Sequence, residues 1–91
     1  MKIDEYRAEF ERETGFAPTE EFLRRVEAAQ EAGMTDEALL GCLKYEAACA
    51  RVVGGVYRRH YGAARGRAEA CDVVYQRMRK VWKRKKEAAP G

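Results

Sequence analysis

The sequence predicts an all-α protein, a small bundle of four to five helices. Ala, Glu and Arg, which all tolerate or favour helices, dominate the 91 residues, and only two prolines occur. Apolar side chains recur every three or four residues, which is the spacing of an amphipathic helix. At this length, with 46% hydrophobic residues, we expect one helical domain over residues 1–87 and a frayed tail over residues 88–91.

The first two helices are expected over residues 3–14 and 20–32. Gly15 follows the first and suits a left-handed C-cap, and Thr19 precedes the second and suits an N-cap. Acidic residues follow Thr19 at once, where negative charge complements the helix dipole. The apolar positions of the two helices are Ile3, Tyr6, Phe10, Phe22, Leu23, Val26 and Ala29.

The third helix is expected over residues 36–53, after a second threonine cap at Thr35. Gly54 and Gly55 then predict its end. The apolar positions that predict this helix are Leu39, Leu40, Leu43, Ala47 and Ala50.

After the two glycines we expect a short helix over residues 56–61 and a last helix over residues 67–87. Gly62 and Gly66 weaken any longer helix in this part of the chain. The last helix carries an apolar stripe of Cys71, Val74, Met78 and Val81, beside Trp82.

The net charge of +3 conceals two halves of opposite sign. Residues 1–46 hold twelve acidic and six basic residues, and residues 47–91 hold three acidic and twelve basic ones. A basic half of this kind is typical of proteins that contact nucleic acid, an anionic membrane or an acidic partner. The alternative is that the two halves neutralise each other within the fold.

The strongest functional signal is "YQRMRKVWKRKK", residues 75–86, with seven basic residues and no acidic one. Such crowding destabilises a helix unless an anion neutralises it. The segment has few side chains able to read base edges, so it favours contact with phosphates over sequence readout. A solvated or acid-paired surface is the competing interpretation.

A second signal is "GGVYRRHYGAARGR", residues 54–67, which combines arginines with aromatic residues. This mixture suits contact with a single strand, where bases stack on aromatic rings. The other interpretation is a joint between helices, with Tyr57 and Tyr61 anchoring it to the core. The candidate nucleic-acid-binding residues of both segments are Arg58, Arg59, His60, Arg65, Arg67, Arg79, Lys80, Lys83, Arg84 and Lys86.

The sequence shows no pattern typical of catalysis or of a cofactor. Cys42, Cys49, His60 and Cys71 match no ligand spacing of a zinc site, and no phosphate-binding loop motif occurs. We therefore expect a non-enzymatic protein without metal or cofactor. Because no signal peptide or membrane-spanning run is present, we expect a cytoplasmic protein whose cysteines are free, small buried hydrophobes.

Residues 10–47, "FERETGFAPTEEFLRRVEAAQEAGMTDEALLGCLKYEA", resemble the DnaD-like C-terminal domain of replication-initiation proteins from Gram-positive bacteria and their phages. The tyrosine, isoleucine and tryptophan pattern that closes that domain is changed: Trp82 is far from Tyr57, and Val74 and Met78 offer another match. Ala29 stands where the family often has tryptophan. The matching positions are Gly15, Pro18, Gly33, Met34, Thr35, Glu37, Leu39 and Leu43.

The resemblance implies a helical module that binds DNA and helps to load a replicative helicase, with DNA contact through the basic segment at residues 77–86. From the residues, we expect a small accessory protein of phage or mobile-element origin that binds nucleic acid, DNA rather than RNA. The rival function is an interaction module or inhibitor that docks onto a host nucleoprotein complex, such as a defence system. The apolar stripe of the last helix is needed for the core, which argues against a membrane partner.

Overall fold

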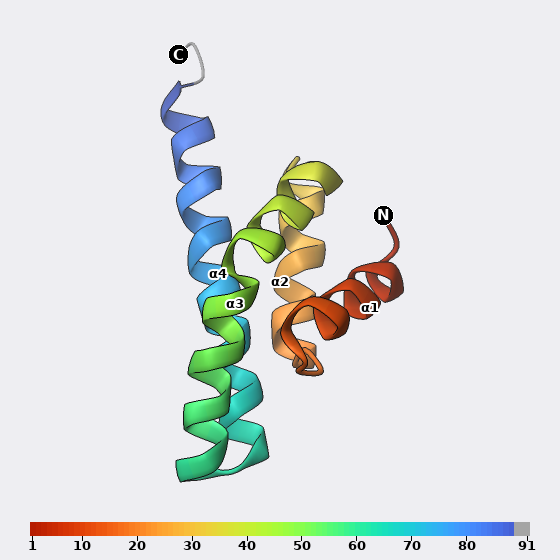
Figure 1. The fold of residues 1–91 in the computed structure, drawn as a ribbon. Helices are drawn as coiled ribbons and strands as arrows, with labels where there is room; N and C mark the ends of the chain where they lie inside the picture. Colours follow the sequence, from red (N-terminus) through yellow and green to blue (C-terminus); the bar gives the residue numbers. More distant parts are fainter. Residues whose placement is uncertain (89–91) are drawn as a thin grey trace.

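The computed structural model describes residues 1–88, and within them every regular element is a helix. The four helices are α1 (Ile3–Thr14), α2 (Glu20–Glu31), α3 (Asp36–Tyr61) and α4 (Ala63–Ala88). α3 and α4 form a long antiparallel hairpin, and α1 and α2 pack beside it (Figure 1). The all-α prediction is therefore confirmed, with four helices rather than five. The principal extents of 46 × 24 × 19 Å reflect the length of this hairpin.

Local capping sets the end of α1 and the starts of α2 and α3, as the sequence predicts, and α2 ends at Glu31, one residue before the predicted end. Gly15 has a positive φ of 76°, and its N–H donates to the carbonyl of Glu11 at 2.9 Å. The hydroxyl oxygens of Thr19 and Thr35 accept from the third backbone N–H beyond them, each at 3.1 Å. These bonds satisfy N–H groups in the first turn and a carbonyl in the last turn of a helix, which have no partner within the helix itself.

The core lies where α1 and α2 meet the α3–α4 hairpin. Its centre is an aromatic cluster in which the rings of Phe10 and Phe22 lie 5.3 Å apart and Tyr6 packs against both. Leu39, Leu43 and other apolar side chains close around it from α3. Each fully buried side chain of this size contributes about 1.5–3 kcal/mol relative to exposure, so this cluster holds α1 and α2 against the hairpin.

The predicted end of the third helix at residue 53 is wrong, because α3 continues through Gly54 and Gly55 to Tyr61. Gly54 is buried where α3 crosses the α1–α2 loop and α4. A Cβ at this position would lie 2.8 Å from the ring of Phe16 and 3.0 Å from the Cβ of Ala70. The glycine therefore allows close packing instead of ending the helix. The expected short helix at residues 56–61 is the last part of α3.

The hairpin turns at Gly62, whose φ of 100° lies in the region that favours glycine. α4 begins directly afterwards at Ala63, four residues before the predicted start at Arg67. Gly66 does not interrupt α4. It lies against α3, where a Cβ would be 2.8 Å from the carbonyl oxygen of Gly54 and from the Cβ of Arg58. Gly54 and Gly66 thus allow the backbones of the two helices to come close together.

Ala88, the first residue of the predicted tail, is the last residue of α4, and residues 89–91 of that prediction lie outside the described part of the chain. Among the described residues, no helix is both long enough and apolar enough to cross a membrane.

Candidate nucleic-acid interface

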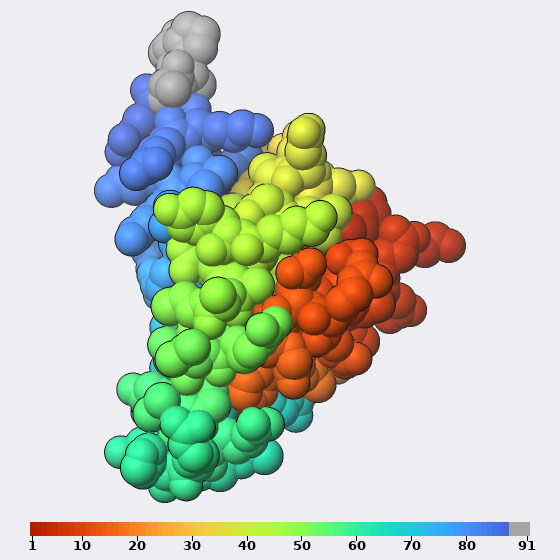
Figure 2. Space-filling model, viewed as in Figure 1, coloured from red at the N-terminus to blue at the C-terminus, as the bar shows by residue number. Residues whose placement is uncertain are grey.

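The C-terminal part of α4 carries the densest group of exposed cations in the described chain. It runs past the start of α3 and forms one end of the molecule, coloured blue in Figures 1 and 2. Four of the predicted residues line one open groove together with Tyr75, Gln76, Trp82 and Glu87; they are Arg79, Lys80, Lys83 and Lys86. Arg84 is also exposed but lies outside the groove lining.

Aromatic contacts hold two of these cations in place. The guanidinium carbon of Arg79 lies 6.0 Å from the ring centroid of Tyr75, and the Nζ atom of Lys86 lies 5.6 Å from that of Trp82. Among residues 1–88, no ion pair involves Lys80, Lys83, Arg84 or Lys85. Their charges are consequently available to an external anion.

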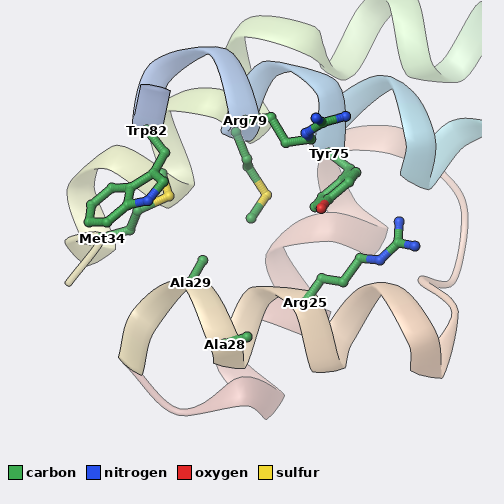
Figure 3. Close-up of a pocket in the computed structure, with 8 residues that line it drawn as sticks. Arg25, Ala28, Ala29, Met34, Tyr75, Arg79 and Trp82 are labelled. Atoms are coloured by element: carbon green, nitrogen blue, oxygen red, sulfur yellow. The ribbon is translucent and has the colours of Figure 1, made fainter. Parts of the chain in front are cut away.

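A smaller apolar pocket adjoins the groove and shares Tyr75, Arg79 and Trp82 with it. The pocket has a volume of about 240 Å³ between α2 and α4. Figure 3 shows Trp82 beside Met34 at one end and Tyr75 facing Arg25 at the other. The guanidinium carbon of Arg25 lies 4.4 Å from the Tyr75 ring centroid, so the apolar pocket has a cationic rim.

The tip of the α3–α4 hairpin holds the second predicted cluster. Arg58, Arg59 and His60 are exposed on the last turn of α3, and Arg58 lies over the Phe16 ring at 5.0 Å. Arg65 pairs with Glu69 at 3.1 Å and also contacts the rings of Tyr57 and Tyr61. Tyr61 itself is 69% exposed, so it does not anchor the tip to the core.

Three basic residues of the second half are used inside the fold, and Arg51 is one of them: it donates to the carbonyl of Glu13 at 2.6 Å. Arg67 donates to the carbonyls of Ala17 at 2.9 Å and Pro18 at 3.0 Å, which ties the α1–α2 loop to α4. Arg77 pairs with Glu46 at 3.0 Å and stacks on Tyr45. All three guanidinium groups have protein partners and are poorly placed to serve a ligand.

The structure places the two predicted clusters at opposite ends of the molecule (Figure 2). Eighteen residues separate Arg65 from Lys83 on α4, which corresponds to about 27 Å along the helix axis. This exceeds the Debye length of about 8–10 Å at physiological salt, so the clusters act separately in one chain. Residues 54–67 are thus a helix end, a tight turn and a helix start, rather than an extended loop or a separate joint.

Internal neutralisation between the halves is slight. Of the seven ion pairs among residues 1–88, only Arg77–Glu46 joins the acidic half to the basic half. The other pairs lie within one half, as in Arg7–Glu20 and Arg25–Glu21. The charge division seen in the sequence therefore persists on the folded surface.

The cysteines are all free, and two of the three match the expected buried positions. Burial raises the pKa of the Cys42 and Cys71 thiols, and the Thr19 N–H donates to the sulfur of Cys71 at 3.4 Å. Cys49 is exposed, which contradicts the expectation for it, because its side of α3 faces away from α1 and α4. In the described residues, no group of three His, Cys, Asp or Glu side chains is arranged to hold a metal ion.

The contact between Arg25 and Tyr75 beside the candidate interface could not be predicted from the sequence. The two residues lie fifty residues apart in sequence on α2 and α4, and no spacing rule connects such positions. The chain matches no protein-family model, and comparisons with curated proteins and with solved structures give no match either.

Proposed function

We propose that this protein is a non-enzymatic accessory protein that binds nucleic acid through phosphate contacts along the basic end of α4. The observation that carries the proposal is the groove lined by Arg79, Lys80, Lys83 and Lys86, with Glu87 as its only acidic lining residue. Cations held close together without an ion-pair partner repel each other, and a polyanion relieves this repulsion.

The ligand class follows from the kind of side chains present. Lysine and arginine bind phosphates whatever the base sequence of the nucleic acid. Gln76 is the only amide side chain in the groove that could read a base edge. We propose DNA before RNA, because the DnaD-like pattern in the first half favours a role at a replication complex. Phage or mobile-element origin belongs to the same proposal and rests on that pattern alone.

Direct binding assays test the proposal. We expect labelled single-stranded or double-stranded DNA to bind the parent protein, with affinity falling about a hundredfold between 50 and 200 mM salt if four phosphates are contacted. Replacing Lys83, Arg84, Lys85 and Lys86 together by Ala should weaken binding strongly and flatten the salt dependence.

A matched control variant shows whether binding depends on the basic end of α4 or only on the net charge of the protein. Lys2, Arg12, Arg24 and Lys44 are also four exposed cations, but they lie outside α4. Replacing them by Ala removes the same charge and should leave most of the affinity intact. Equal binding by the parent and the α4 variant would rule the proposal out.

The apolar pocket beside the groove favours the rival function, docking onto a protein partner within a nucleoprotein complex, such as a host defence system. Trp82 and Met34 offer an apolar anchor site, and Arg25 and Arg79 could pair with acidic residues of the partner. Under this alternative, Trp82→Ala would abolish capture of a partner after nuclease treatment, while the salt-dependent binding of DNA would be weak in the parent.

A further inference from the structure

One face of α3 is apolar and largely exposed, with the guanidinium of Arg77 from α4 over the ring of Tyr45. Tyr45 is 72% exposed and Val52 66% exposed, and Cys49 lies between them. Figure 2 shows the surface of α3 open between α1 and the last part of α4. The face consists of Ala38, Gly41, Tyr45, Ala48, Cys49, Val52 and Val56, which, apart from the adjacent pair Ala48 and Cys49, follow each other at three or four residues as in a helix-packing seam.

The positions of these residues are nearly symmetric about the middle of α3, and large and small side chains stand at opposite positions. If a second copy of α3 runs antiparallel with Ala48 opposite Cys49, then Tyr45 lies opposite Val52 and Gly41 lies opposite Val56. Each large residue thus faces a smaller one on the other copy. This is the arrangement that a two-fold interface requires, because the same patch must fit itself.

A hollow on the surface lies where this pairing would place a side chain. It has a volume of about 250 Å³ and is lined by apolar groups around Gly41 and Tyr45, with Arg77 at its edge. A Cβ built on Gly41 has no atom within 4 Å, so space is open above the helix backbone. In the antiparallel pairing Val56 of the second copy enters this hollow as a knob enters a hole.

Charges at the two ends of the face also complement each other. Glu37 precedes the face and Arg59 follows it, both exposed, and among residues 1–88 neither takes part in an ion pair. The antiparallel pairing sets Glu37 of each copy beside Arg59 of the other. A parallel pairing would instead place like charges together.

We infer that this face of α3 binds a second copy of the chain in an antiparallel, two-fold dimer. The inference rests on the apolar register, the hollow at Gly41 and the charged ends, and it is independent of nucleic-acid binding. In such a dimer the basic end of α4 in one copy and the arginine-rich tip of the other lie at the same end. Pairing would thereby bring together the two basic clusters that a single chain keeps apart.

Sedimentation equilibrium tests the dimer directly. The parent should show twice the single-chain mass of 10.4 kDa at high concentration and dissociate on dilution. Val52→Glu puts two charges at the centre and should give the single-chain mass, with an unchanged helical circular dichroism spectrum because Val52 is outside the core. A parent that stays monomeric, or a dimer that Val52→Glu leaves intact, overturns the inference.

Cross-linking tests the register. Cys49 lies next to the two-fold axis, so copper-catalysed air oxidation should join two Cys49 thiols into a disulfide, with their two electrons and two protons passing to oxygen. Cys49→Ser should prevent the covalent dimer. A covalent dimer that persists in this variant would contradict the register.

Charge exchange and volume provide two further tests of the same interface. Glu37→Arg should raise the dimer dissociation constant several-fold, and adding Arg59→Glu in the same chain should restore it. Gly41→Gln should fill the hollow and weaken the dimer, although it favours the helix itself. Failure of the charge exchange to restore association would overturn the antiparallel arrangement.

Discussion

Gly54 and Gly55 are adjacent in α3 and yet have different environments. Gly54 contacts the Phe16 ring so closely that a Cβ would lie at 2.8 Å, whereas a Cβ on Gly55 would meet only the end of the flexible Arg59 side chain at 3.8 Å. Both residues weaken the helix to the same extent by their own conformational freedom. Only Gly54 is required by packing.

This difference predicts opposite effects of the same substitution. Gly54→Ala should destabilise the fold by about 1–2 kcal/mol, because crowding in the core exceeds the gain in helix propensity. Gly55→Ala should stabilise it by about 0.5–1 kcal/mol. Urea unfolding followed by circular dichroism measures both, and a stabilised Gly54→Ala variant would contradict the packing at this crossing.

The three cysteines predict a clear order of chemical reactivity. Cys49 is exposed, while burial blocks access to Cys42 and Cys71 and raises the pKa of each thiol, so less of the reactive thiolate is present. With a thiol reagent at pH 8 and low protein concentration, Cys49 should be modified at least tenfold faster than the others. Peptide mass spectrometry identifies the site, and early labelling of Cys71 would contradict its burial.

At the scale of the elements, the sequence predicted those boundaries that local chemistry determines. Thr19, Thr35 and Gly15 act within one turn of the chain, and the helix ends that they predict are correct. The boundary at Gly54 was wrong, because the reason for this glycine is its contact with Phe16, thirty-eight residues away. Sequence spacing alone cannot separate a glycine that ends a helix from one that lets two helices approach.

The same distinction applies to the candidate site. The exposure of the basic end of α4 followed from its own composition. The pocket beside it did not, because it needs Arg25 and Met34 from α2 and the following turn to meet Tyr75 and Trp82 from α4. The residues at the tip were also predictable as a group, but their distance from the α4 groove depends on the length of two uninterrupted helices.

At the basic end of α4, Lys83 is expected to lower the stability of the fold and to strengthen DNA binding. Its neighbours at helical spacing are the basic Arg79, Lys80 and Lys86 and the acidic Glu87. Lys83→Glu replaces three like-charge contacts by attractive ones and one attractive contact by a repulsive one, so it should stabilise the fold by about 0.5 kcal/mol at low salt. The same change should weaken DNA binding at least tenfold, and a gain in both properties would argue against the proposed interface.

For the whole molecule, packing is concentrated at the middle of the long hairpin. The core residues of α4 run from Ala70 to Met78, and from Lys83 to Glu87 every side chain is exposed. Stability should accordingly decrease toward the basic end.

Limited trypsin digestion tests this gradient, because every part of α4 contains a basic residue. The first cuts should fall after Lys80 to Lys86, while Arg67 and Arg77, which are held by hydrogen bonds and an ion pair, resist. Mass spectrometry of early fragments gives the order of cleavage. Initial cleavage after Arg67 would show that the middle of the hairpin opens first.

The double hydrogen bond from Arg67 to the α1–α2 loop affects how an alanine scan of this protein should be interpreted. Arg67→Ala removes one positive charge, as Lys83→Ala does. It also removes the two hydrogen bonds that hold the α1–α2 loop against α4. A loss of affinity in that variant would be a false positive for ligand contact. Lysine at position 67 is a poor rescue, because a single ammonium group cannot reproduce the planar fork of a guanidinium.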